Sequence, residues 1–174
     1  MKFPGCILFL LAAFCFSPAV HAEQQMRVPF NFQWGESAAR VEQSLVGIKA
    51  KITERKVVEG RTVFVVEGIP QKQLQRALFY FRNDMLNEIE LHFGDSSWDS
   101  PRYDLFFEEV RRNVDSKYGI GRLLTRSRNR EGDVLQTLVG YQWMQGSIAL
   151  RLYLFTAEKD PNALRILSLH YKEA

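Results

Sequence analysis

Residues 40–68, RVEQSLVGIKAKITERKVVEGRTVFVVEG, recur as residues 112–140, RNVDSKYGIGRLLTRSRNREGDVLQTLVG, when the sequence is shifted by 72 positions. Eight residues are then identical, whereas unrelated segments of this length share about two by chance. The pairs Glu59-Gly60 and Glu131-Gly132 coincide where a hairpin turn is expected, and Gly47 and Gly119 each follow a helical pattern. An internal repeat of this kind predicts two copies of one supersecondary unit.

Each copy extends into one helix followed by strands. Ser37 is a good N-cap for the first helix, and Ser100-Pro101 opens the second with proline near its permitted first position. Gly47 is expected to supply a left-handed stop, and residues 28–34 are expected to form an extended edge segment. Alternating apolar residues predict strands at residues 48–53, 62–67, 77–82, 86–93, 119–128, 134–143, 148–156 and 164–171.

The sequence therefore predicts an α+β fold, in which two tandem helix-plus-four-strand halves, residues 23–95 and 96–174, form one continuous antiparallel sheet with both helices on one face. Ile148, Leu150, Leu152 and Leu154 are expected to face the helices. Beyond residue 140 the repeat continues at an offset of 74, pairing Leu78 with Leu152. This offset turns Leu78 and Tyr80 inward, and Phe79 and Phe81 outward.

Residues 1–22 have the layout of a cleaved secretory signal: a single charge at Lys2, an apolar run from Cys6 to Phe16, and small residues before Glu23. The apolar run is shorter than the ~20 residues that span a bilayer. Both cysteines of the chain lie in this segment, so the mature chain is expected to have no disulfide. We expect export, to a bacterial periplasm or otherwise by secretion, and no transmembrane segment in the mature chain.

Tandem helix-plus-four-strand halves resemble the β-lactamase-inhibitory-protein fold of exported bacterial proteins. The stretch Phe32-Gln33-Trp34-Gly35-Glu36-Ser37-Ala38-Ala39-Arg40-Val41 is also similar to a motif at the start of the first helix in small envelope proteins of that fold, a glycine and an N-cap serine before a valine. The resemblance implies protein binding on the open face of the sheet. The inhibitory proteins carry disulfides, and the mature chain here has no cysteine, so the target is not carried over.

Aromatic side chains expected to face outward are the main candidates for partner binding, since aromatic area is what interface hot spots use. The alternative is that these residues are core, covered by loops, by the lead-in segment or by a second copy of the chain. The candidates are Phe79, Phe81, Tyr141, Trp143, Tyr153 and Phe155.

Alternating arginines form a second candidate. Seven basic residues and one acid, Asp115, occupy residues 111–130, and Arg126, Arg128 and Arg130 are placed to line one face of a strand and bind anionic groups. A solvated helix end and hairpin is the alternative explanation. His92 and His170 occupy equivalent places on the last strand of each half, where two histidines and a carboxylate could hold zinc. No ligand spacing of a known type supports a metal, so the sequence favours two polar residues on a solvated face and no metal site is predicted.

Sequence motifs of known enzymes are absent from residues 23–174: there is no cysteine nucleophile, Gly-x-Ser-x-Gly elbow or His-Glu-x-x-His pair. We expect no catalytic residues and no cofactor. Without Lys2 the charges number 22 basic and 20 acidic, which gives no reason to expect nucleic acid. The sequence favours a non-enzymatic domain that binds an envelope or extracellular protein. A carrier of a lipid or other anionic hydrophobic ligand is the alternative function. The sequence is also compatible with a homodimer.

Overall fold

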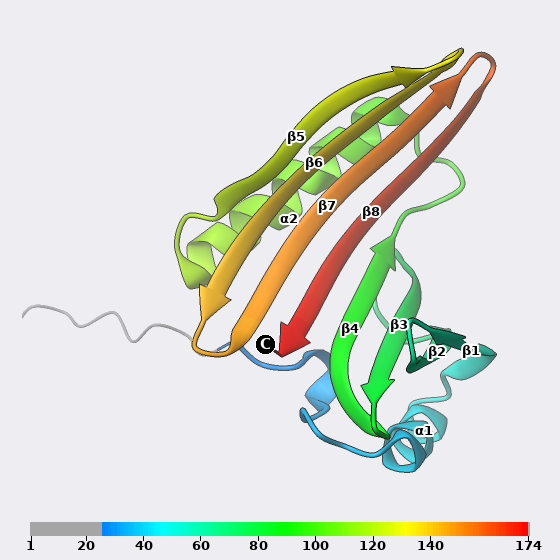
Figure 1. Cartoon of the computed structure of the whole chain (residues 1–174), viewed down its shortest axis with the longest axis vertical. Helices are drawn as coiled ribbons and strands as arrows, with labels where there is room; N and C mark the ends of the chain where they lie inside the picture. Colours follow the sequence, from blue (N-terminus) through cyan, green and yellow to red (C-terminus); the bar gives the residue numbers. More distant parts are fainter. Residues whose placement is uncertain (1–25, 174) are drawn as a thin grey trace, which may run out of the picture.

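Eight antiparallel strands form one sheet in the order β1-β2-β3-β4-β8-β7-β6-β5 (Figure 1). The computed structural model describes residues 26–173, so the predicted signal peptide lies outside the described residues. The elements are a 3-10 turn at Pro29–Asn31, α1 Ala38–Gly47, β1 Lys51–Val58, β2 Arg61–Glu67, β3 Leu74–Arg82, β4 Met85–Phe93, α2 Ser100–Tyr118, β5 Arg122–Glu131, β6 Val134–Gln145, β7 Ile148–Lys159 and β8 Asn162–Glu173. The predicted α+β class with an eight-stranded antiparallel sheet is confirmed.

The helices start close to where the sequence predicts. Ser37 caps α1, because its hydroxyl accepts a hydrogen bond from the backbone N–H of Arg40. The cap of α2 is Asp99, whose carboxylate accepts from the N–H of Arg102 at 2.9 Å, one residue before the predicted start. These side chains satisfy backbone donors that have no partner within the helix.

Two local predictions are wrong. Residues 28–34 contain a 3-10 turn and form no strand, since Phe30 and Asn31 both take a positive φ. Gly47 ends α1 without a positive φ; the left-handed residue is Lys49, with φ 60°. The left-handed residue that follows α1 therefore lies two positions beyond the glycine at which the sequence predicts it.

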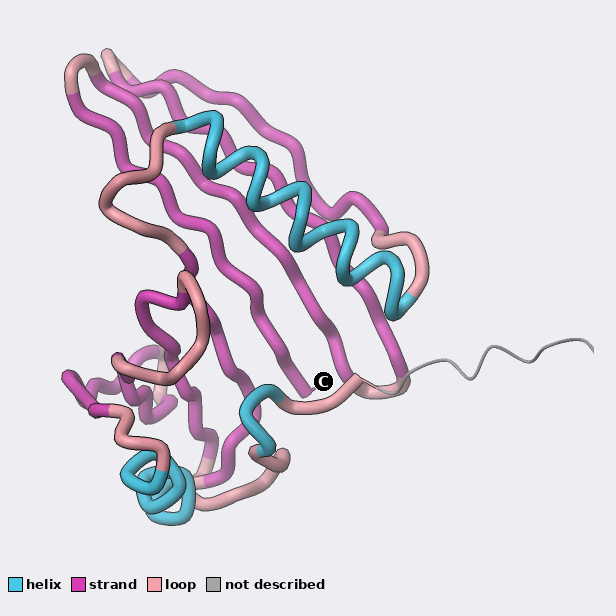
Figure 2. Tube along the Cα trace, turned by 180° about the vertical axis from the view of Figure 1, so that it is seen from behind, coloured by secondary structure: helices cyan, strands magenta, loops and turns pink. Residues whose placement is uncertain are grey.

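The strands bury most of their apolar side chains on one face of the sheet, which we call the apolar face. A smaller buried cluster of Val63, Val65 and Leu78 lies on the other face. Leu150, Leu152 and Leu154 on β7 lie opposite Tyr171, Leu169 and Leu167 on β8, as predicted for the helix side. Figure 2 shows α2 lying across this face. Its Phe106 ring lies 5.8 Å from Phe93, and its Phe107 ring lies 6.1 Å from Tyr141.

Helix α1 contributes to the same core through Val41 and Leu45, which are 0% and 1% exposed. Met26 and Phe32 of the lead-in segment join the cluster, and the Phe32 ring meets Phe79 edge-on at 5.1 Å. Burial of this apolar surface supplies most of the favourable free energy of folding.

The opposite face, which we call the open face, alternates with the apolar one along every strand. On β4 and β8 it carries the pairs Glu88 with Lys172, Glu90 with His170, and His92 with Ser168. On β7 it continues through Arg151, Tyr153 and Phe155. Figure 1 views this side, with α2 behind the strands.

Phe79 and Phe81 lie on the apolar face, so their predicted outward orientation is wrong. They are 0% and 1% exposed, and the register places Phe79 opposite Ile89. Leu78 and Tyr80, predicted inward, face the open side opposite Glu90 and Glu88. The prediction matches residues of β3 with residues of β7 that lie 74 positions later. An even offset assigns matched residues to the same face of the sheet, whereas the observed faces require an odd offset. A slip of one residue is enough to exchange the two faces of a strand.

The hairpin turns show the same slip. The first loop is Glu59-Gly60, between the paired residues Val58 and Arg61. The second is Gly132-Asp133, between Glu131 and Val134, one residue later than the sequence alignment places it. Matching glycines in the two copies therefore do not occupy the same turn position, and an offset of 72 matches side chains from opposite faces.

Candidate functional site

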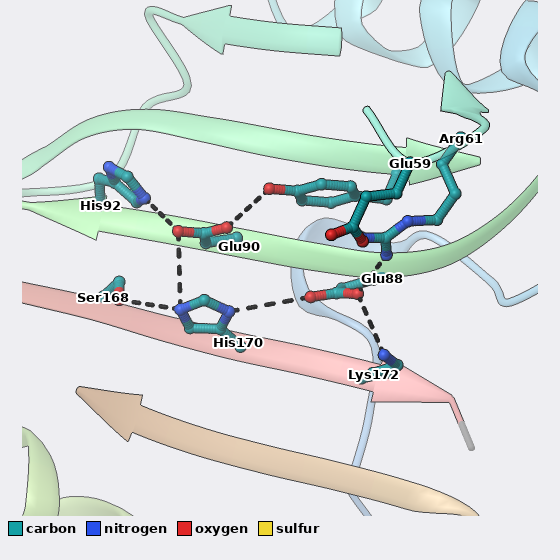
Figure 3. Close-up of polar contacts among 9 residues, drawn as sticks. Glu59, Arg61, Glu88, Glu90, His92, Ser168, His170 and Lys172 are labelled. Carbon is teal, nitrogen blue, oxygen red and sulfur yellow. Dashed lines mark hydrogen bonds and ion pairs between the residues drawn. The ribbon is translucent and has the colours of Figure 1, made fainter. Parts of the chain in front are cut away.

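A group of charged and polar side chains occupies the centre of the open face, where β4 pairs with β8 (Figure 3). The alternation of residues 86–93 places Glu88, Glu90 and His92 on one side of β4, and the register brings β8 residues beside them. Residues from β2 and β3 complete the group. We call it the charged cluster; it consists of Arg61, Tyr80, Glu88, Glu90, His92, Ser168, His170 and Lys172.

Glu88 pairs with three basic residues of the charged cluster. Its Oε2 accepts a hydrogen bond from Arg61 Nη1 at 2.7 Å and lies 3.6 Å from Lys172 Nζ. Its Oε1 lies 3.8 Å from His170 Nδ1. Arg61 reaches it from β2 by crossing the ring of Tyr80, with 4.6 Å between guanidinium and centroid.

The pKa of Glu88 falls from 4.5 to about 2. Burial acts to raise this pKa, because a buried carboxylate loses hydration, but His170, Arg61 and Lys172 together lower it by more. The carboxylate is therefore ionised across the physiological pH range and binds its cationic neighbours.

Glu90 also interacts with three side chains of the charged cluster. Tyr80 donates its hydroxyl to Oε2 at 2.8 Å, His92 Nε2 hydrogen-bonds Oε1, and His170 Nε2 lies 3.6 Å from that oxygen. Burial raises the pKa of Glu90, but the hydrogen bond from His92 and the charge of His170 outweigh it and lower the pKa. Burial and the neighbouring Glu90 carboxylate raise the pKa of Tyr80, so its phenol stays protonated.

The hydrogen bonds of His92 define its tautomer. Arg76 Nε donates to Nδ1 at 3.1 Å, so Nδ1 carries a lone pair and Nε2 carries the proton that is donated to Glu90. His170 uses its Nε2 to hydrogen-bond Ser168 Oγ at 2.8 Å. Its ring meets Tyr153 edge-on at 5.2 Å.

Ser168, His170 and Glu88 follow one another in the order of a nucleophile, base and acid. The site does not support acyl transfer, however. Ser168 is 5% exposed and lies between its strand partners His92 and Tyr153. The 3.8 Å separation of Glu88 from His170 exceeds a hydrogen bond, and backbone N–H groups in paired strands are not free to stabilise an oxyanion. The charged cluster forms a satisfied polar network that gives this part of the open face a defined shape.

The two histidines do approach one carboxylate, Glu90, as the alternative zinc hypothesis requires. Within residues 26–173, however, no group of three or more His, Cys, Asp or Glu side chains is arranged to hold a metal ion. Arg61, Arg76 and Lys172 add positive charge around the carboxylates, which opposes the binding of a further cation.

The six predicted aromatic residues divide between the faces. Tyr153 and Phe155 lie half-buried on the open face, as predicted. Trp143 is 3% exposed on the apolar face, and Tyr141 is half-buried there against Phe107 of α2. Together with Phe79 and Phe81, Tyr141 and Trp143 are core residues, and the prediction that they face outward is wrong.

Two aliphatic residues extend the surface around Phe155, and the sequence prediction missed them. Register places Leu138 on β6 and Ile166 on β8 directly beside Phe155, and both are half-buried. Tyr153 covers Gly140, where a Cβ atom would lie 2.6 Å from its ring. We call Leu138, Tyr153, Phe155 and Ile166 the open-face patch. The sequence signal that could have identified Leu138 and Ile166 is their alternation with residues of the apolar face.

Arg126, Arg128 and Arg130 share one side of β5, as predicted, opposite Val139, Thr137 and Leu135 on the apolar side. All three are exposed. They lie at the edge of the sheet, separated from the charged cluster by the intervening strands β6 and β7, so the structure does not bring these arginines and the charged cluster into one site.

Comparisons of this chain with protein-family models, with curated proteins and with solved structures find no match. No helix within residues 26–173 is long and apolar enough to cross a membrane.

Proposed function

We propose that this chain is an exported, non-enzymatic domain that binds another protein through the open face of its sheet. The observation that carries the proposal is the open-face patch, four apolar side chains made contiguous by strand register. They lie half-buried on the side of the sheet opposite α2. Contiguous exposed apolar area next to polar residues is typical of protein interaction sites.

The neighbouring charged cluster suits such a surface. Its side chains are fixed by mutual hydrogen bonds, so a partner that docks on them loses little side-chain entropy. Tyr153 connects the two parts, because its ring covers Gly140 and meets His170. A rigid polar rim beside an apolar centre is the usual anatomy of a protein interface.

Three sequence-based inferences remain part of this proposal. The order of one helix and four strands occurs twice, which supports duplication and fusion at residues 95–96. Val41 and Leu45 of α1 share the core with Phe106 and Phe107 of α2, which supports the placement of both helices on the apolar face. These features also support the resemblance to the β-lactamase-inhibitory-protein fold, and export rests on residues 1–22.

The test is a capture experiment with exported proteins of the source organism. The immobilised protein is compared with Tyr153→Ser/Phe155→Ser, and with Val57→Ser/Leu105→Ser as a control at residues 74% and 62% exposed elsewhere. We expect a discrete partner that the wild type and the control retain and the open-face variant loses. Equal capture by all three folded proteins would contradict the proposal. So would a wild-type dimer that the open-face variant dissociates in light scattering, because a second copy would then cover the patch.

A carrier function is a second candidate, favoured by a pocket of about 360 Å³ between α2 and the sheet. Its apolar lining includes Phe106, Val114 and Leu169, and Lys72 and Lys117 line the same pocket. An anionic amphiphile fits this combination, although none of the predicted arginines Arg126, Arg128 and Arg130 lines the pocket. Organic extraction of purified protein should then release a lipid that is depleted in Lys72→Glu/Lys117→Glu. An extract without lipid would exclude this function.

A further inference from the structure

The outer edge of the sheet at β5 carries backbone groups without strand partners. β5 is the last strand of the sheet and pairs with β6 alone among the described strands (Figure 1). In an antiparallel ladder, alternate residues of an edge strand direct their N–H and C=O groups outward. Such an edge can accept a further strand.

The arginines of this edge have no partners either. Arg126, Arg128 and Arg130 are exposed, and none forms an ion pair or side-chain hydrogen bond with another described residue. The opposite edge differs, because on β1 Arg55 pairs with Glu42 at 2.5 Å and Lys56 with Glu54 at 3.3 Å. The three arginines thus form a row of positive charge, and Glu131, the one acid of β5, accepts a hydrogen bond from Gln136 and pairs with none of them.

Apolar side chains adjoin these arginines at the start of β5. Ile120, Leu123 and Leu124 are 93%, 48% and 38% exposed. The edge therefore presents an apolar end followed by a regularly spaced positive stripe.

We propose that β5 is a docking edge for an extended acidic segment of another protein, which adds to the sheet as a further antiparallel strand. Alternate residues of a strand are about 6.7 Å apart, so glutamate or aspartate at every second position of the added strand would meet Arg130, Arg128 and Arg126 in turn. Apolar residues at the C-terminal end of the segment would reach Leu123 and Leu124.

A second copy of this chain is a poor occupant of the same edge. Antiparallel pairing of two β5 strands centred on Arg128 would place arginine opposite arginine at all three positions. Like charges directly opposite one another destabilise a ladder. The stripe therefore protects the edge from self-association and selects an acidic partner. This inference is independent of the proposed function, because it uses a different surface from the open-face patch.

The probe is a capped, fluorescently labelled peptide with glutamate at alternate positions, threonine between them, and Val-Leu at its C-terminal end. Binding to the full chain is measured by anisotropy, and hydrogen exchange locates the amides that gain protection. We expect protection at residues 122–131, and an affinity that falls about tenfold or more in Arg126→Gln/Arg128→Gln/Arg130→Gln, or about 1.4 kcal/mol. Tyr153→Ser/Phe155→Ser should bind like the wild type.

Matched controls separate strand addition from general attraction. Arg27→Gln/Arg82→Gln/Arg112→Gln removes the same charge at exposed residues elsewhere and should keep the affinity. A peptide with glutamine for glutamate, or with a central proline that cannot join the ladder, should bind at least about tenfold more weakly. Equal binding of the proline peptide would overturn the proposal in favour of ionic adhesion. Binding to phosphatidylglycerol vesicles without binding to the peptide would overturn it in favour of a lipid surface.

Discussion

At the scale of single residues, Arg61 contacts two carboxylates in very different surroundings. The side chain of Glu88 is 11% exposed and lies 2.7 Å from Arg61, whereas that of Glu59 is 82% exposed and lies 3.7 Å away. Water screens an exposed pair almost completely, but a buried charge that loses its partner keeps its desolvation cost. The same substitution should therefore destabilise the protein much more at Glu88 than at Glu59.

Acidification should destabilise the protein through Glu88. Folding lowers the pKa of this carboxyl from 4.5 to about 2. The stabilisation is therefore complete above about pH 4.5 and is lost as the pH falls toward 2, where the folded state must also take up the proton. Urea denaturation at a series of pH values should show the free energy of unfolding decreasing across this window.

Glu88→Gln tests whether Glu88 causes this decrease in the free energy of unfolding. It should cost about 3 kcal/mol at pH 7, because Arg61 and Lys172 lose their counter-ion, and it should flatten the decrease below pH 4.5. Glu59→Gln is the matched control and should cost less than about 1 kcal/mol while keeping the wild-type pH profile. An unchanged acid slope in Glu88→Gln would show that other groups cause the loss.

At the scale of elements, Asp115 fastens the C-terminal end of α2 to the sheet. Its Oδ1 accepts from the indole Nε1 of Trp143 at 3.0 Å and from the backbone N–H of Gly121 at 2.8 Å. Gly121 packs against the same indole, since a Cβ atom there would lie 2.4 Å from the ring. The one acid among the basic residues 111–130 therefore positions the turn from α2 into β5.

Asp115→Ala should destabilise the protein by about 1–3 kcal/mol, because the partly buried N–H of Gly121 loses its acceptor and the indole N–H of Trp143 keeps only the Gly119 carbonyl. Asp104→Ala is the control in the same helix, since Asp104 is exposed and forms no side-chain bond with another described residue. Urea denaturation followed by tryptophan fluorescence gives both values. Equal stability of the two variants would contradict this role of Asp115.

At the scale of the whole molecule, the assignment of the two faces can be tested with one pair of phenylalanines. Phe79→Ala should cost about 3–5 kcal/mol, because it opens a cavity beside Phe32 in the core. Phe155→Ala should cost about 1 kcal/mol, because its side chain is half-buried on the open face. Denaturant unfolding of both variants measures the two losses of stability. A larger loss for Phe155→Ala than for Phe79→Ala would support the face assignment that the repeat predicts.

Local chemistry was enough to predict the class of fold and most of its elements. The caps near Ser37 and Ser100, the alternation of residues 86–93 and the leucines of β7 each depend on interactions between residues close in sequence. The same alternation placed Tyr153 and Phe155 on their observed side of the sheet, and it placed the three arginines of β5 together on one side of their strand. These features are encoded locally because a helix cap or a strand period needs no distant partner.

Tertiary structure alone decided which residues of the two halves share a face and which strands meet. Face assignment depends on turn position to within one residue, since one inserted residue turns Phe79 and Phe81 from the surface into the core. The charged cluster depends on the pairing of β4 with β8, which brings residues 88–92 beside residues 168–172. No local pattern specifies that register; it follows from the packing of the whole apolar face, which is why His92, His170 and Glu90 could be placed together only by the folded chain.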